Sequence, residues 1–151
     1  MDRLALVRRF LYTSTKGGFH MNIDAKQKVL LAIYTEYQKD MPDMSRITHT
    51  SLDMDAQVFR VAIDKLESKG YIRGAKIHYP AGRPYPDAVI PNFIKMTREG
   101  LQFVEEKMDI ERGLTGSEKV AELRTKFGKF GWNALTDFAA KTLVELAKQV
   151  I

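Results

Sequence analysis

Apolar residues recur three and four positions apart over 53–69, which is the spacing that places side chains on one face of an α-helix. This apolar face is made of Phe59, Ala62, Ile63 and Leu66. Asp53 or Asp55 is placed to cap the start of the helix, and Gly70 suits the left-handed residue that commonly follows a helix end. The pattern therefore predicts an amphipathic helix that stops before Gly70.

The pattern then changes from a helical to a strand-like spacing. The β-prone residues that follow Gly70 are Tyr71, Ile72, Ile77 and Tyr79. A segment rich in Pro and Gly, Tyr79 to Asp87, separates them from a second apolar run, Ala88 to Met96. Pro91 lacks a backbone donor and places this end of the return strand at an edge or a bulge. We expect a β-hairpin whose tip lies near residues 79–87.

An earlier amphipathic helix is expected to begin after Asn22 or Asp24 and to run to about Lys39. Its apolar positions are Val29, Leu30, Ile33, Tyr34 and Tyr37, and its exposed positions are expected to include Lys26, Lys28 and Glu36. Pro42 cannot continue the helix and restricts the residue before it.

Two shorter helices are expected on either side of the central segment. One would cover about Ser45 to Ser51, with Ser45 as its N-cap. The other would follow Thr97 as N-cap, with Leu101, Phe103, Val104 and Met108 on its apolar side. Its paired acids, Glu105 and Glu106, are expected to point outward, because solvated charge is the usual state of such residues.

Two stretches carry a resemblance to a known family. Leu66-Glu67-Ser68-Lys69-Gly70-Tyr71-Ile72 and Met96-Thr97-Arg98-Glu99-Gly100-Leu101-Gln102-Phe103-Val104 resemble a frame that is shared by many winged-helix proteins. The similarity is greatest to the YjcQ-like family of small bacterial and prophage proteins, over roughly Met21 to Met108. It implies a mainly α fold with a small β-hairpin, namely a winged helix-turn-helix domain over 21–111.

The C-terminal part is expected to be a helical extension, residues 118–151, joined by a linker at 112–117. An apolar seam runs along its final helix and is the expected homodimer contact: Leu135, Phe138, Leu143, Leu146 and Val150. Such a stripe must be covered by a second copy, by the winged domain or by a membrane surface. The stripe is too short and too charged to be an integral membrane segment.

Charge is distributed unevenly along the 151 residues, whose net charge is +5. Residues 1–21 hold four Lys and Arg against one Asp, whereas residues 22–111 hold 13 Lys and Arg against 14 Asp and Glu. Lys16-Gly17-Gly18 can be encoded by a ribosome-binding sequence just upstream of Met21. Residues 1–20 are therefore interpreted as a translated leader, with a basic amphipathic arm as the alternative.

Several chemistries have no support in the sequence. The chain contains no cysteine, and its three histidines share no metal-ligand spacing. No nucleophile elbow, phosphate-binding loop or dinucleotide fingerprint occurs. We therefore expect a non-enzymatic protein without a cofactor or metal, and the lack of cysteine fits a cytoplasmic location.

The expected function is DNA binding by a phage- or prophage-related transcriptional regulator. In this hypothesis helix 53–69 reads bases through Gln57, Arg60 and Lys65, and the wing at 76–87 holds phosphates through Lys76 and Arg83. The near-neutral core favours the alternative, a protein-interaction module that uses the same fold and the apolar C-terminal helix.

Overall fold

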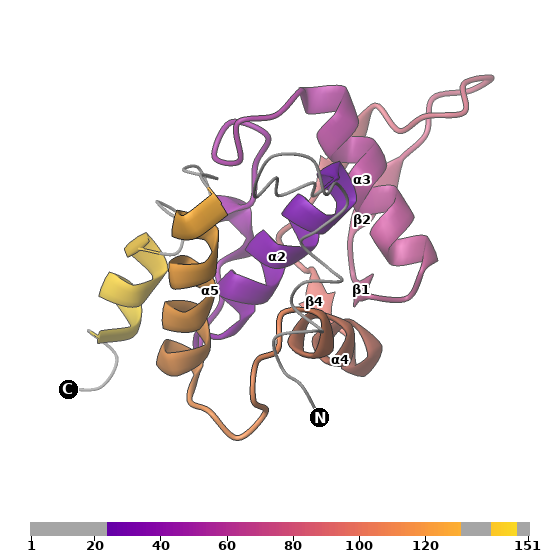
Figure 1. The fold of residues 1–151 in the computed structure, drawn as a ribbon. Helices are drawn as coiled ribbons and strands as arrows, with labels where there is room; N and C mark the ends of the chain where they lie inside the picture. The colour runs from indigo at the N-terminus through magenta and orange to yellow at the C-terminus, as the bar shows by residue number, and fades with distance from the viewer. Residues whose placement is uncertain (1–23, 131–139, 148–151) are drawn as a thin grey trace, which may run out of the picture.

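The computed structural model describes residues 24–130 and 140–147, of which roughly half are helical. The helices are α2 (Ala25–Tyr37), α3 (Ala56–Ser68), α4 (Arg98–Lys107) and α5 (Gly116–Phe130), with a 3₁₀ turn η1 (Met44–Arg46). The strands are β1 (Ile72–Arg73), β2 (Lys76–His78), β3 (Ala88–Ile90) and β4 (Lys95–Met96). Figure 1 shows α2 at the centre, with α3 and the hairpin on one side and α5 on the other. The predicted mainly α architecture with a small antiparallel hairpin is confirmed.

Helix α2 is the centre of the core. It begins with a capping box, in which Asp24 and Gln27 each accept a hydrogen bond from the other's backbone N–H. Every residue from Val29 to Glu36 is buried, and α2 contacts α3, α4, η1 and β4. The prediction that Glu36 is exposed was wrong, because the turn after α2 and the C-terminal segment cover that side of the helix.

The predicted second helix at Ser45–Ser51 is also wrong. Only η1 forms there, and its cap is Asp43, which accepts a hydrogen bond from the Ser45 N–H. Thr48 and Ser51 then exchange hydrogen bonds between side chains and backbone, over 3.0 and 3.1 Å. Such local bonds give the backbone an alternative to a helical ladder, so the segment folds as turns.

Helix α3 agrees closely with its predicted pattern. The Asp55 carboxylate accepts hydrogen bonds from the N–H groups of Gln57 and Val58 and caps the helix. The four apolar residues predicted to face inward, Phe59, Ala62, Ile63 and Leu66, are all buried. Gly70 has a φ of +77°, as expected of a residue that follows a helix end.

The hairpin after α3 consists of two short antiparallel pairs instead of one continuous ladder. β1 pairs with β4 through Ile72 and Met96, and β2 pairs with β3 through Ile77 and Val89. Gly74, on one side, has a φ of +87°, and the loop that begins at Pro91 interrupts the other side. The tip beyond β2 and β3 projects away from the helices (Figure 1).

Helix α4 begins at Thr97 as predicted, since the Thr97 hydroxyl accepts a hydrogen bond from the Gly100 N–H over 3.0 Å. Its inner side includes Val104 and is followed by buried Met108. The prediction that Glu105 points outward was wrong, because this side chain is only 6% exposed and lies against α2 and α5.

The C-terminal part packs against the rest of the chain. Helix α5 starts at Gly116, inside the predicted linker 112–117, and Leu123 joins the main hydrophobic core. Residues 140–147 are helical, and Leu146 and Leu143 pack with Val120 of α5. Figure 1 shows this short helix beside α5.

Three of the five residues in the expected dimer contact, Leu135, Phe138 and Val150, lie outside the described residues, so homodimerisation stays a prediction. Among the residues described, no helix has both the length and the apolar character needed to cross a bilayer.

Candidate nucleic-acid interface

Two of the three predicted base-reading residues of α3, Gln57 and Arg60, are hydrogen-bonded to each other, and Gln57 also binds the hairpin. The Gln57 side-chain N–H donates to the Pro86 carbonyl over 3.1 Å, and its side-chain oxygen accepts from the Arg60 guanidinium over 2.8 Å. Both ends of the Gln57 amide are therefore engaged within the chain. The bond to Pro86 holds the segment just before β3 against the start of α3.

A second contact between hairpin and helix lies about two turns further along α3, at Asp64. The Tyr79 hydroxyl donates a hydrogen bond to the Asp64 carboxylate. This bond, with smaller effects of burial and nearby negative charge, raises the pKa of Tyr79 to about 12. Asp64 thus pairs with the hairpin, although it lies four residues after Arg60, which is the spacing of a helical ion pair.

Arg60 faces a hollow of about 260 Å³ between α3, the turn after η1 and the hairpin, which is also lined by Thr48, His49 and Pro91. Its Nε is buried and has no hydrogen-bond partner among the described residues. The Arg60 guanidinium thus donates one hydrogen bond to Gln57, while its Nε–H has no acceptor among the described residues.

Lys65 is the one predicted contact of α3 that is fully exposed in the structure. It borders an apolar groove of about 260 Å³ between α2 and α3, together with Lys26. The groove's apolar lining includes Val58, Val61 and Tyr85, and Val58 is 46% exposed. Along this groove α3 therefore combines aliphatic surface with one exposed cation, Lys65.

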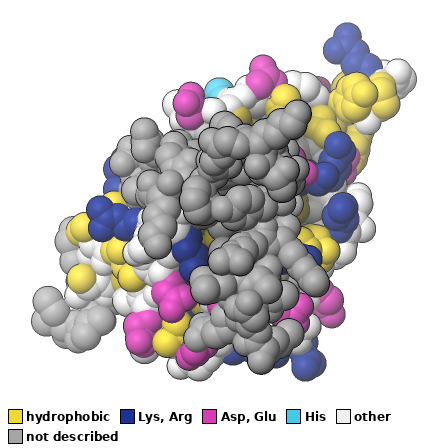
Figure 2. Space-filling model, in the orientation of Figure 1, with side chains coloured by type: hydrophobic (Ala, Val, Ile, Leu, Met, Phe, Trp, Pro, Cys, Tyr) yellow, Lys and Arg dark blue, Asp and Glu magenta, His cyan; other side chains and the backbone are white. Residues whose placement is uncertain are grey.

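The hairpin exposes a group of positively charged side chains. Arg73, Lys76, Arg83 and Lys95 are all exposed, whereas the only carboxylate between residues 71 and 96 is Asp87. Asp87 lies 2.6 Å from the His78 ring, and this hydrogen bond lowers the pKa of the carboxyl. Figure 2 shows Lys and Arg side chains at the end of the projecting tip and along the edge below it.

Two of these four cations, Arg73 and Lys95, are absent from the predicted site. They lie directly opposite each other in the β1–β4 pair, next to buried Ile72 and Met96. The alternation of buried and exposed residues in these strands was the available signal. Their pairing depends on strand register, which the sequence pattern did not define across the interrupted hairpin.

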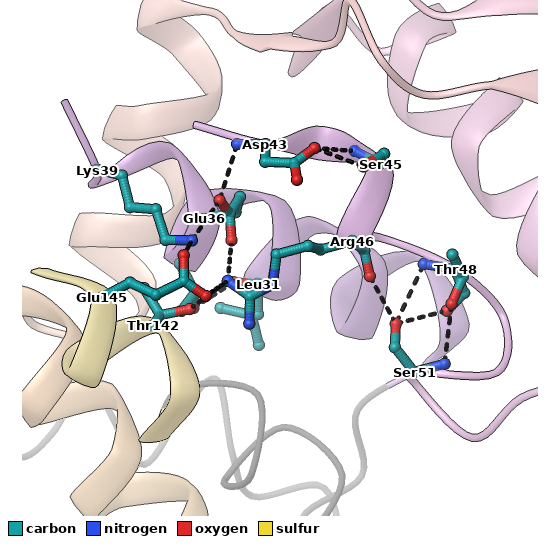
Figure 3. Close-up of polar contacts among 11 residues, drawn as sticks. Leu31, Glu36, Lys39, Asp43, Ser45, Arg46, Thr48, Ser51, Thr142 and Glu145 are labelled. Atoms are coloured by element: carbon teal, nitrogen blue, oxygen red, sulfur yellow. Dashed lines mark hydrogen bonds and ion pairs between the residues drawn. The ribbon is translucent and has the colours of Figure 1, made fainter. Parts of the chain in front are cut away.

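Away from the hairpin, a partly buried network joins α2 to the C-terminal segment (Figure 3). The Glu36 carboxylate accepts from Lys39 over 2.8 Å and from Arg46 over 2.5 Å. Lys39 also pairs with Glu145, and Arg46 donates to the Thr142 hydroxyl over 3.3 Å. The hydrogen bond from Lys39, with the nearby Arg46 charge, lowers the pKa of Glu145. Because each of these groups is paired within the chain, we assign the network a structural role.

Glu105 forms a second buried link. It accepts hydrogen bonds from the Tyr34 hydroxyl of α2 and from the Lys119 ammonium of α5, both over 2.8 Å. Burial, followed by the bond to Glu105, raises the pKa of Tyr34. Within the described part of the chain, no group of three or more His, Asp or Glu side chains is placed to hold a metal ion.

The chain matches no protein-family model, no curated protein and no solved structure. Its function must therefore be argued from the geometry of its own residues.

Proposed function

We propose that the protein is a winged-helix DNA-binding protein in which the hairpin is the wing and makes the main phosphate contacts. One observation carries this proposal: the hairpin exposes four cations, and its single carboxylate is hydrogen-bonded to His78. Lys and Arg side chains that neutralise phosphates supply most of the sequence-independent affinity for DNA. A projecting hairpin with this charge is suited to lie along a duplex backbone.

The order of elements supports the same proposal. Helix α3 precedes the hairpin and is bonded to it through Gln57 and Asp64, so the two would approach DNA as one unit. Lys65 provides an exposed cation on α3. Gln57 and Arg60 would have to exchange their present bonds for base contacts, so we assign the larger part of the binding energy to the hairpin. Regulation of phage or prophage genes follows only from the resemblance to YjcQ-like proteins.

The test is fluorescence anisotropy of the full-length chain with labelled random-sequence duplex DNA over a salt series. Arg83→Ala should weaken binding and lower the slope of log affinity against log salt by about 1, as expected for one lost phosphate contact. The matched control is Arg124→Ala, which removes an exposed arginine from α5, on the other side of α2 in Figure 1. Absence of binding at low salt, or an equal effect of both variants, would contradict the proposal.

The apolar groove beside α3 favours a second candidate, a protein-interaction module. Its floor is aliphatic, and Lys26 and Lys65 stand at its edges. This arrangement suits an amphipathic helix of a partner protein that carries carboxylates beside its apolar stripe. A synthetic Leu/Glu helix should shift the methyl NMR signals of Val58 and Val61 at lower concentration than its Leu/Lys counterpart. Equal shifts, or none, would remove this candidate.

A further inference from the structure

A second hollow lies at the base of the hairpin, on the side that faces the end of α2. Its volume is about 540 Å³, which lies within the range of sites for small ligands. One wall includes Tyr37 and Asp40, at and beyond the end of α2, and the other includes Arg73, Phe93 and Lys95 of the hairpin. None of the residues that line it belongs to α3, so the hollow lies apart from the base-reading helix, although Arg73 and Lys95 belong to the four exposed cations of the hairpin.

The hairpin wall places two cations side by side. Arg73 and Lys95 are register partners, and like charges directly opposite each other destabilise an antiparallel pair. In the part of the chain that the structure describes, neither has an ion-pair partner. Lys39, which also borders the hollow, is already bound by Glu36 and Glu145. A phosphate group would relieve the repulsion, and the planar fork of Arg73 can hold two of its oxygens.

An aromatic ring lies next to these cations. Phe93 is 60% exposed, which is unusual for so large an apolar side chain, and the Lys76 ammonium stands 4.8 Å from the centre of its ring. Flat heterocycles stack on exposed rings of this kind. Across the hollow, the exposed Asp40 carboxylate can accept hydrogen bonds from a hydroxyl or an exocyclic amine but would repel an anion. The hollow is therefore suited to a ligand that has a phosphate at one end and, at the other, a ring system with hydrogen-bond donors.

We propose that this hollow is a nucleotide site, in which Arg73 and Lys95 bind the phosphate and Phe93 packs against the base. The nucleotide is either a free molecule or one unpaired unit of a single strand, since both present the same chemistry. Arg73 and Lys95 also belong to the hairpin cations assigned to duplex DNA, whereas Arg83 and Lys65 take no part in the nucleotide site. Arg83→Ala should therefore weaken duplex binding and leave nucleotide binding unchanged, which distinguishes the two proposals.

The test is a titration of the full-length chain with AMP, GMP, inorganic phosphate and a single-stranded 12-mer, followed by backbone amide NMR shifts. AMP or GMP should shift signals of Arg73, residues 92–95 and residues 37–40. Lys95→Ala should weaken nucleotide binding at least tenfold, since hydrogen bonds to charged groups have about that effect. Lys141→Ala, which removes an exposed lysine from the C-terminal segment, should leave it unchanged.

A second variant separates a nucleotide site from a simple anion site. Phe93→Ala should weaken the binding of AMP and GMP several-fold and leave the binding of inorganic phosphate unchanged. Shifts with free nucleotides support a free ligand, and the same shifts with the 12-mer alone support a single strand. The proposal would be overturned if none of the four probes caused a localised shift at about 10 mM, an order-of-magnitude limit for weak sites. Nucleotide binding that is insensitive to both Lys95→Ala and Phe93→Ala would also overturn it.

Discussion

At the scale of single residues, two glutamates are buried and paired, Glu36 with nearby residues and Glu105 with a residue far away in the chain. Glu36 pairs with Lys39 and Arg46, and Glu105 accepts hydrogen bonds from Tyr34 and Lys119. Removing a carboxylate from water is costly, and only partners held in good geometry offset the cost. Loss of one partner from either buried group should therefore lower the free energy of unfolding more than the same substitution at an exposed pair.

Helix α4 provides an internal comparison, because Glu105 is buried and its neighbour Glu106 is exposed. Glu105→Ala should lower the free energy of unfolding by about 3–5 kcal/mol, since it leaves the Lys119 charge and the Tyr34 hydroxyl without their acceptor. Glu106→Ala breaks only the exposed contact with Arg112 and should change the free energy of unfolding by less than about 1 kcal/mol. Urea unfolding of both variants measures the difference, and equal losses would show that the Glu105 bonds contribute little.

At the scale of elements, the hairpin is held at two levels. Near the tip, Gln57 and Asp64 bind it to α3. Near the base, Gly74 approaches the backbone of Phe93, and a Cβ added at Gly74 would lie 2.1 Å from the Phe93 carbonyl oxygen. The position of the proposed nucleotide site therefore depends on a glycine between β1 and β2.

Gly70 and Gly74 have similar φ values, +77° and +87°. Comparing an alanine substitution at each position therefore distinguishes the cost of a positive φ from the cost of a steric clash. A Cβ at Gly70 meets nothing within 4 Å, so Gly70→Ala should cost about 1–2 kcal/mol through its positive φ alone. Gly74→Ala carries the same strain and also displaces the Phe93 backbone, so it should lower the free energy of unfolding by a clearly larger amount. Urea unfolding gives both values, and amide shifts of residues 92–95 should change only in Gly74→Ala. Equal destabilisation would mean that the close approach relaxes freely.

At the scale of the whole molecule, the segment 140–147 closes over α2 and α5. Leu146 packs against Val120, while Glu145 and Thr142 reach the polar group around Glu36. Much of this attachment is electrostatic, which makes it sensitive to pH. The groups that face Glu145 are Lys39 and Arg46, which lower its pKa, and Asp43, which opposes them.

The attachment should weaken in acid. Because the folded pKa of Glu145 is lowered, its contribution is complete above the ordinary range of a carboxyl and is lost as the pH falls through the lowered value. Methyl NMR signals of Leu146, followed from pH 7 to pH 3, should move towards those of a solvent-exposed leucine. In Glu145→Gln the acid-dependent part of this movement should be reduced, because the side chain no longer titrates. An identical transition in the variant would assign the change to other carboxyls.

Local features of the fold were predictable because each depends on residues close together in the chain. The buried face of α3, the caps at Asp24, Asp55 and Thr97, and the left-handed Gly70 all follow from helical spacing and side-chain bonds over two to four positions. The failed second helix has the same local origin, since Thr48 and Ser51 bond to the nearby backbone in turns.

The candidate site was only partly predictable. Lys65, Lys76 and Arg83 are exposed as the pattern suggested, but the bond between Gln57 and the hairpin, and with it the environment of Arg60, depends on how β2 and β3 lie over α3. The sequence by itself determined the helices, their caps and the presence of a basic hairpin, because these are encoded over a few residues. Only the tertiary structure decided that Glu36 and Glu105 are buried and that Arg73 faces Lys95, because burial and strand register are set by segments that meet from distant parts of the chain.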